Sequence, residues 1–579
     1  MDVKVLDAET KKTIKSANTR GVGADSIFGS QIDDLSREIS LGLGAGMDKV
    51  EAAQLDIKGI TTHSLDAYRY FLKGKEACNL HNWTEARKNL EKALEIDPAF
   101  GMAYVYLAWT YVDPGPEETI VETLEKARTL SDKSSQKDAL YLDGLHAYFV
   151  QKDTRKAVQH LDELLRRYPD EKWALHISGD FVRKDGDLEG AHGRYKKWLD
   201  LDPQDSNALY HLSNVSLMMG NLERAEEYLK RHEAVASPDI YNLRIQALIY
   251  IRLGQLDNAI AKHKKLYEIR PELPQTTLAN LYSYKEDYEE ARKWADLSVS
   301  LAKSPGGRSS AFLTRGDISL LKGALVDALA DYDRAVEAVR TEASLNNAWA
   351  FEGKGFVHLA RREYEAARQS LENMRAALAE YSKDVAPVDR IEWAFDMGML
   401  QLGQGQVGQA KAKLSEILSL LPEIVKEQQP GYHLRHELLQ GEILLVQGKL
   451  DEALACAKKA CGPESPYWRR GVVIFIAQSY YMDLAARIYA RKGDTRRAIS
   501  EYERLLGTNF STGFTFPVHP LYRYRLGLLY EKANDAQNAR LQIERFLLLW
   551  KDADPGLAEV EDAKKRLAGL SKFGSGRVS

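Results

Sequence analysis

Gly403, Gly405 and Gly408 have the spacing of the GxGxxG pattern, which binds the pyrophosphate of a dinucleotide. That chemistry needs a strand before the glycines and a helix that begins at the phosphate, so that its first N–H groups face the anion. Here an apolar stretch of helical spacing ends near Leu402, and a second one follows with Ala410. The pattern therefore predicts a turn between two helices and no nucleotide cofactor.

The histidines and cysteines lack the spacing of metal ligands. The segment His433–Glu437 reads His-Leu-Arg-His-Glu, whereas a zinc protease helix needs His-Glu-x-x-His. Cys456 and Cys461 have no second pair nearby, and together with Cys78 they are too few for a disulfide framework, so small buried side chains are expected. We identify no metal site, no cofactor and no catalytic residues, and we predict that the chain is not an enzyme.

Charge and hydropathy exclude further classes. Lys and Arg number 80 and Asp and Glu 84, and the two signs are mixed throughout the sequence. No basic run predicts binding to nucleic acid or to an anionic membrane. The longest apolar stretch, Val472 to Ala477, is far too short to cross a bilayer, and residues 1–20 have no secretory pattern. We expect a cytoplasmic protein without membrane insertion, or an extracytoplasmic one if the chain is part of a membrane-anchored parent.

Small residues at regular intervals indicate which elements build the fold. Most members of a series of alanines lie twelve residues after another small residue, as Ala191 does after Gly179 and Ala453 after Gly441. Two helices joined by a tight turn need this pairing when they pack so closely that only Gly, Ala or Ser fits at the contact. The series consists of Ala86, Ala157, Ala191, Ala225, Ala259, Ala291, Ala328, Ala367, Ala410, Ala453, Ala498 and Ala539, with Ile120 filling the one gap.

Proline and glycine mark the ends of the same units. Asp97-Pro98 and Asp202-Pro203 end second helices, because proline cannot continue the hydrogen-bond ladder. Glycines such as Gly220 and Gly323 lie five residues before the second-helix alanine, where the chain must turn. These features resemble the tetratricopeptide repeat, whose period is about 34 residues. The resemblance implies an all-α fold, a right-handed α-solenoid (superhelix) of about thirteen helix hairpins between residues 64 and 550.

The ends of the chain differ from the repeats. Val3 and Val5 alternate with polar neighbours before a polar turn and Thr13-Ile14, which predicts a β-hairpin, and a helix is expected to follow over residues 27–43. We interpret residues 1–60 as part of an α/β domain or as an N-terminal cap. The remaining divisions expected are an N-terminal array at 61–310, a C-terminal array with longer repeats at 311–550, a capping helix at 551–570 and a disordered tail at 571–579.

The resemblance also places candidate binding residues, since the first helix of each pair lines the concave surface in this family. In repeats four to six that surface carries aromatic, basic and amide side chains, which suit an extended acidic peptide. The alternative is that the aromatic residues pack between repeats and the charges are solvated. The candidates are Trp173, His176, Arg183, Lys184, Asn207, Tyr210, Asn214, Tyr241, Arg244 and Arg252. Earlier repeats place Tyr68, Phe71, Lys75, Trp109, Tyr141, Tyr148 and Phe149 on the same surface.

A connector in the C-terminal array is a second candidate. Residues 508–517 contain three phenylalanines in a segment with glycine and proline, which suits either an exposed anchor or a plug folded into the array. We expect the plug.

Two functions are compatible with these patterns. Residues 61–80 and 525–555 are similar to the two ends of repeat arrays in bacterial signalling proteins, where a kinase, cyclase or winged-helix domain precedes the array. The resemblance implies a non-catalytic scaffold that binds a protein or peptide, as the interaction or sensory region of such a protein. The alternative is a small-molecule sensor whose ligand lies inside the superhelix. The sequence does not predict the oligomeric state.

Overall fold

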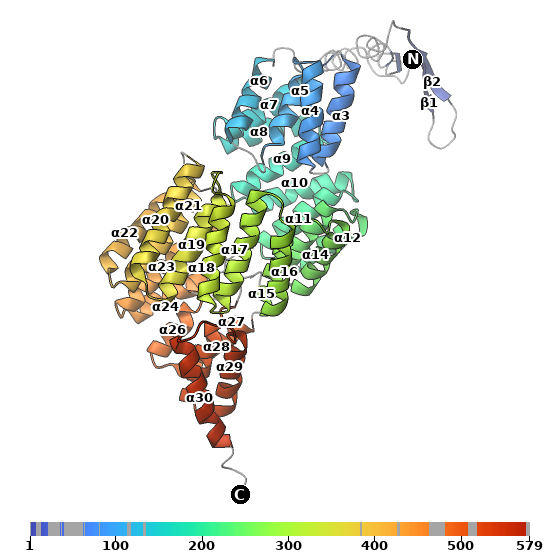
Figure 1. Cartoon of the computed structure of the whole chain (residues 1–579). Coiled ribbons are helices and arrows are strands. Elements are labelled where there is room, and N and C mark those ends of the chain that lie inside the picture. Colours follow the sequence, from blue (N-terminus) through green and yellow to red (C-terminus); the bar gives the residue numbers. More distant parts are fainter. Residues whose placement is uncertain are drawn as a thin grey trace. The chain divides into compact units, whose positions relative to one another are not determined.

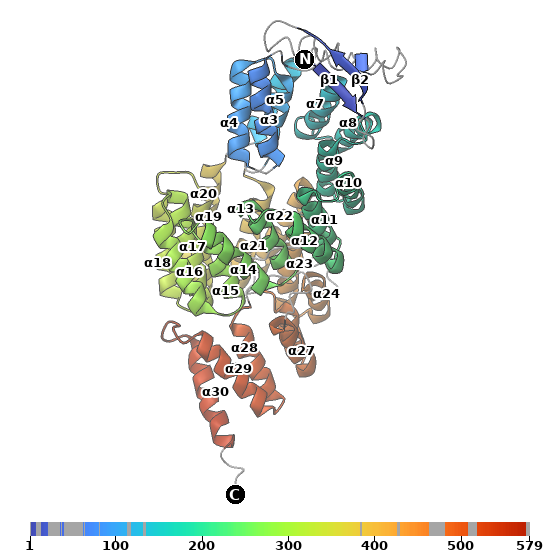
Figure 2. The same cartoon turned by 90° about the vertical axis from the view of Figure 1, so that its right-hand side faces the viewer.

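The computed structural model describes residues 2–6, 13–20, 35, 38–39, 62, 64–79, 82–112, 117–130, 135–382, 385–424, 426, 429–461, 481–507 and 518–574. The chain divides into two compact units, Met1–Ala208 and Leu209–Ser579. The expected division into arrays at 61–310 and 311–550 rests on repeat length and stays a prediction. In both units, helix pairs follow one another along the chain (Figures 1 and 2).

The first unit begins with the β-hairpin that the sequence predicts. Strands β1 (Asp2–Leu6) and β2 (Thr13–Asn18) are antiparallel, with Val3 opposite Ala17. Of the helix expected at residues 27–43, only Leu35, Glu38 and Ile39 are described, and all three are helical. Four helix pairs follow: α3 (Leu65–Asn79) with α4 (Trp83–Ile96), α5 (Gly101–Trp109) with α6 (Glu117–Thr129), α7 (Gln136–Phe149) with α8 (Thr154–Arg167), and α9 (Lys172–Lys184) with α10 (Leu188–Leu201).

The second unit continues the same pattern, and its first helix, α11, begins within the first unit. The pairs up to residue 381 are α11 (Ser206–Met218) with α12 (Leu222–Val235), α13 (Ile240–Arg252) with α14 (Leu256–Ile269), α15 (Thr276–Tyr284) with α16 (Tyr288–Leu301), α17 (Pro305–Leu321) with α18 (Leu325–Ala338), and α19 (Leu345–Ala360) with α20 (Tyr364–Tyr381). The later pairs are α21 (Pro387–Gly403) with α22 (Val407–Leu420), α23 (Gln429–Val446) with α24 (Leu450–Cys461), α26 (Leu484–Arg491) with α27 (Thr495–Leu506), and α28 (Leu521–Lys532) with α29 (Ala536–Leu549). The short η3 (Leu421–Glu423) follows α22, and α30 (Ala558–Gly574) is the last helix described.

The described residues therefore contain the thirteen helix pairs that the sequence predicts. The longer repeats after residue 310 contain longer helices, since α17 has 17 residues and α20 has 18, against 14 in α14. Helix α30 extends past residue 570, where we expected the capping helix to end, so residues 571–574 are helical rather than part of a disordered tail. Residues 575–579 and the phenylalanine-rich segment 508–517 lie outside the described residues.

Close helix contacts explain the spacing of the small residues. A Cβ atom added at Gly179 of α9 would lie 2.4 Å from the ring of Tyr195 in α10, and that ring is fully buried. Between these helices, Gly186 has a φ of 89°, which a side chain would disfavour, and the Asp187 side chain then accepts the N–H of Gly190 as an N-cap. A residue with positive φ also forms the turn in most of the other pairs, and a side-chain N-cap begins many of the second helices.

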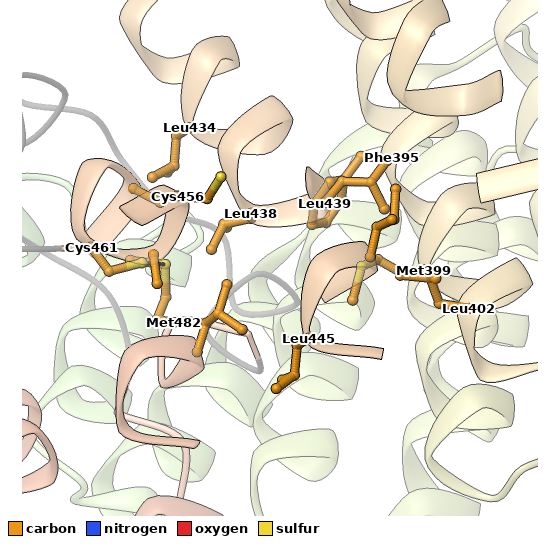
Figure 3. Close-up of a cluster of buried hydrophobic side chains, with 14 of the residues drawn as sticks. Phe395, Met399, Leu402, Leu434, Leu438, Leu439, Leu445, Cys456, Cys461 and Met482 are labelled. Carbon is orange, nitrogen blue, oxygen red and sulfur yellow. Dashed lines mark hydrogen bonds between the residues drawn. The ribbon is translucent and has the colours of Figure 1, made fainter. Parts of the chain in front are cut away.

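The core of the second unit continues from one helix pair into the next. Figure 3 shows Phe395 and Met399 of α21 with Leu439 of α23, and these side chains belong to one buried cluster. Cys456 and Cys461 are buried in the same cluster, as the sequence predicts. Gly403 ends α21, Gly405 lies in the turn and Gly408 is the second residue of α22, so the predicted turn between two helices is confirmed. Among the described helices, none has both the length and the apolar content that crossing a membrane requires.

The glycine contact predicts opposite effects for two alanine substitutions in one hairpin. Gly179→Ala forces a Cβ into the buried ring of Tyr195, and we expect it to destabilise the protein by about 1–3 kcal/mol. Gly193→Ala adds a Cβ on the exposed face of α10, where no atom lies within 4 Å, and should stabilise by about 0.5–1 kcal/mol. Thermal unfolding of both variants checks this. Equal shifts of both midpoints would show that the contact does not limit packing.

Burial predicts that the three cysteines are inert in the native protein. Burial raises the pKa of the Cys78 thiol to about 12 and, with a smaller contribution from Glu437, that of Cys456 to about 11; it also raises the pKa of Cys461. Since the thiolate is the nucleophile, few of these groups are ionised at pH 8. We expect negligible labelling by iodoacetamide in the native state and complete labelling in urea, measured by intact mass. Rapid native labelling would contradict this assignment.

Candidate functional site

A cavity of about 340 Å³ in the first unit is the strongest candidate site. Its walls come from the first helices α3, α5 and α9, together with the starts of α4 and α11, part of α10 and the loops before α9 and α11. Four of the chain's nine tryptophans line it, so we call it the tryptophan pocket. The lining residues are Lys75, Cys78, Trp83, Trp109, Asp170, Glu171, Lys172, Trp173, His176, Trp198, Asp205 and Asn207.

Ring contacts hold the aromatic wall of the pocket in place. Trp173 stacks on Tyr106 with ring centroids 4.0 Å apart and an angle of 12° between the planes. It meets Trp109 edge-on at 6.3 Å. His176 meets Trp109 edge-on at 5.9 Å and lies 5.1 Å from Trp198. Because each ring packs against the next, the wall is fixed before any ligand arrives.

Most charges at the tryptophan pocket are already paired. Lys172 pairs with Asp202 at 2.7 Å, and Lys137 pairs with Glu171. Lys75 is partly exposed, and its ammonium nitrogen lies 5.7 Å from the centre of the Tyr106 ring. Among the described residues, no carboxylate lies within ion-pair distance of Lys75. Lys75 is therefore the cation of the pocket that a ligand can meet.

Trp198 is fixed by a hydrogen bond as well as by ring contacts. Its indole N–H donates to the Asp205 carboxylate at 3.0 Å. The same carboxylate accepts the backbone N–H groups of Asn207 and Ala208, at 3.0 and 3.1 Å, and so caps the start of α11. One loop side chain therefore positions both Trp198 and Asn207 at the pocket.

The structure brings together three of the five candidate residues that lie in the first unit. Trp173, His176 and Asn207 line the tryptophan pocket. Arg183 instead lies 3.5 Å from the Asp180 carboxylate on the same helix, and Lys184 lies 5.9 Å from the centre of the Tyr148 ring. Neither of these two cations lines the tryptophan pocket, and their role in binding stays a prediction.

The candidates of the second unit lie on α11 and α13. Arg252 donates to the side-chain oxygen of Asn214, so these two residues bind each other. Tyr210 and Tyr241 are partly exposed, and Arg244 is exposed. No cavity of the second unit described here includes any of the five, and their role in binding stays a prediction.

Our sequence reasoning missed Trp83 and Trp198, because it searched first helices alone. Trp83 begins α4 and Trp198 belongs to α10, and both are second helices. Tryptophan is rare in this chain, with nine among 579 residues. Four tryptophans within the first four repeats were a signal that did not depend on the helix to which each belongs.

Comparisons with known proteins agree with this architecture. Tetratricopeptide repeat models match residues 139–171, 183–247 and 484–558. No curated protein matches the chain.

Two solved structures are similar over long stretches. A chain in the crystal structure of the APC/C hetero-tetramer Cut9-Hcn1 is 15% identical, covering 87% of this chain and 96% of that one, with a TM-score of 0.33. A tetratricopeptide repeat protein from Parabacteroides merdae is also 15% identical, covering 48% of this chain and 94% of that one, with a TM-score of 0.27. The helix pairs and the matched segments identify tetratricopeptide repeats in this chain, arranged as an α-solenoid.

Proposed function

We propose that the chain is a non-catalytic scaffold that binds an extended peptide segment of a partner protein, with the tryptophan pocket as an anchoring site. Tetratricopeptide repeats suggest protein interaction, and the observation that supports this site is the cavity lined by four tryptophans. Tryptophans held in a fixed geometry around a cavity are typical of the residues that dominate binding energy at protein interfaces.

An apolar side chain of the partner is the ligand group that fits the wall. Trp109 and Trp173 line the cavity with apolar rings, and the packing of these rings means that little conformational entropy is lost on binding. A cavity of about 340 Å³ has room for one large side chain and part of the backbone.

The charges at the rim specify the neighbouring residue of the peptide. Lys75 offers an ammonium group to one carboxylate. Asp170 is exposed on the same cavity and has no ion pair among the described residues, so it repels a second carboxylate. The peptide we propose carries one acidic residue, or its own carboxyl terminus, next to an apolar anchor.

Charge reversal at Lys75 tests this proposal. Peptides selected from a displayed random library against the full chain should share an aromatic or large aliphatic residue close to one acidic residue. Lys75→Glu should weaken binding of such a peptide at least tenfold, equivalent to ~1.4 kcal/mol, because the carboxylate then faces a like charge. Fluorescence anisotropy of the labelled peptide measures the change.

Lys73→Glu is the matched control for that substitution. Lys73 lies on the same helix, is exposed and does not line the tryptophan pocket. It should leave the affinity within about twofold, since a distant surface charge is screened by salt. Equal losses of affinity in the two variants would show that the effect comes from net charge alone and would overturn the assignment. Selection of peptides without an acidic residue would also overturn it.

We further propose that the scaffold serves a bacterial signalling protein, as the resemblance of residues 61–80 and 525–555 implies. The coding sequence on the 5′ side of the Met1 codon should then encode a kinase, cyclase or winged-helix domain in the same frame or the same operon. Reading that sequence tests the proposal. Neighbouring genes of unrelated function, together with a stop codon directly upstream, would contradict it.

A further inference from the structure

The last helices of the second unit fold back onto its α16–α18 region. The Trp550 indole N–H donates to the Leu321 carbonyl at 2.8 Å, although the two residues are 229 positions apart. The Asp554 carboxylate accepts the backbone N–H of Val326 at 3.0 Å. This bond caps α18, whose own N-cap position holds Ala324 and so has no side-chain cap.

Ion pairs and close packing strengthen the same contact. Arg523 donates to the Glu286 carboxylate at 2.9 Å, and Lys322 pairs with Asp552 at 2.7 Å. Gly323 has a φ of 71°, which favours glycine, and a Cβ atom added there would lie 3.0 Å from the indole of Trp550, so a side chain at this position would press on the indole. We call this set of residues the clasp: Arg523, Trp550, Asp552 and Asp554.

A cavity of about 420 Å³ lies between the first helices of four helix pairs and the C-terminal segment that folds back, residues 518–574. Side chains of α17, α19, α21 and α23 form one part of its wall, and His519, Arg525 and Glu559 form the part that the fold-back supplies. Its size is in the range of about 300–1,000 Å³ typical of small-molecule sites. The apolar lining consists of Leu320, Leu321, Phe356, Leu359, Ala360, Met399, Leu402 and Val446.

The deeper charges of this cavity neutralise one another. Arg487 donates to Glu442 at 3.1 Å and to Asp483 at 2.7 Å, and Arg525 donates to Asp483 as well. Burial alone would raise the pKa of Asp483, but the guanidinium groups of Arg525 and Arg487 hold it at about 2. Both lining charges of this network, Glu442 and Arg525, therefore have counter-charges within the protein.

The remaining polar groups add no net charge. Arg362 and Glu559 line the cavity with opposite signs. Burial, with the nearby Arg525, lowers the pKa of His519 to about 3, so its imidazole is neutral at physiological pH. The backbone N–H of Leu521 donates to His519 Nδ1 at 3.2 Å, which leaves the ring proton on Nε2. The four lining charges, Arg362, Arg525, Glu442 and Glu559, therefore sum to zero. A ligand with a net charge would lose its hydration here without meeting an excess of the opposite charge in the wall.

We propose that this cavity binds an uncharged, mainly apolar small molecule with one polar end. The apolar wall supplies the binding energy, and the clasp keeps the wall closed. The site lies in the other unit from the tryptophan pocket and does not rest on the proposed peptide binding.

Displacement of an uncharged dye from the full chain tests the proposal. Nile red should bind saturably with increased fluorescence, and 1-octanol should displace it. Octanoate and octylammonium, which have the same chain but a charged end, should need at least tenfold higher concentrations. Absence of saturable dye binding, or equal competition by all three compounds, would overturn the proposal.

Two variants assign the dye to this cavity. Ala360→Trp fills it from an exposed position at the end of α19 and should weaken Nile red binding at least tenfold. Ala379→Trp, at an exposed position of α20 outside the lining, should not change it. Circular dichroism checks that both variants fold, and Asp554→Ala, which removes the cap on α18, should also weaken dye binding. Unchanged binding in both Ala360→Trp and Asp554→Ala would overturn the assignment, whereas Lys75→Glu should leave the dye bound.

Discussion

A close contact between a small residue of the first helix and a side chain of the second helix recurs along the repeats, and the rest of this structure depends on it. Added Cβ atoms would lie 2.6 Å from Leu90 at Gly74 and 2.7 Å from Ile543 at Gly527. Each partner side chain lies one helical turn after the repeat alanine, so the two small positions fix both the distance and the register of the helices. With that register fixed, the opposite face of each first helix is free to carry residues for binding.

The tryptophan pocket shows how the packing rule becomes a binding surface. Gly179 lets α9 approach α10 closely, and at this short distance His176 of α9 packs on Trp198 of α10 while both line the pocket with Trp173. The ring contacts that fix this wall also belong to the core, since Tyr106 is buried. Stability and recognition therefore use the same side chains, and a ligand meets a wall that needs little rearrangement.

Many helices are capped by residues close in sequence, but the N-terminus of α18 is capped by a residue from the end of the unit. Asp187 and Asp535 cap the helices that follow them through bonds to nearby backbone N–H groups. Ala324 occupies the equivalent position before α18, and Asp554 supplies the missing bond from 228 residues away. The missing side-chain cap at Ala324 is therefore compensated by a contact with the end of the unit.

The sequence by itself determined the helix pairs, their turns and the N-terminal hairpin, because these depend on contacts between residues near in sequence. It also indicated Trp173, His176 and Asn207, through the side of the first helix on which they lie. Only the tertiary structure decided that Trp83 and Trp198 join them, and that Arg183 pairs with its own helix. The physical reason is that small rotations between successive repeats accumulate, so the meeting of α3 with α9, or of α17 with α30, depends on all the intervening packing.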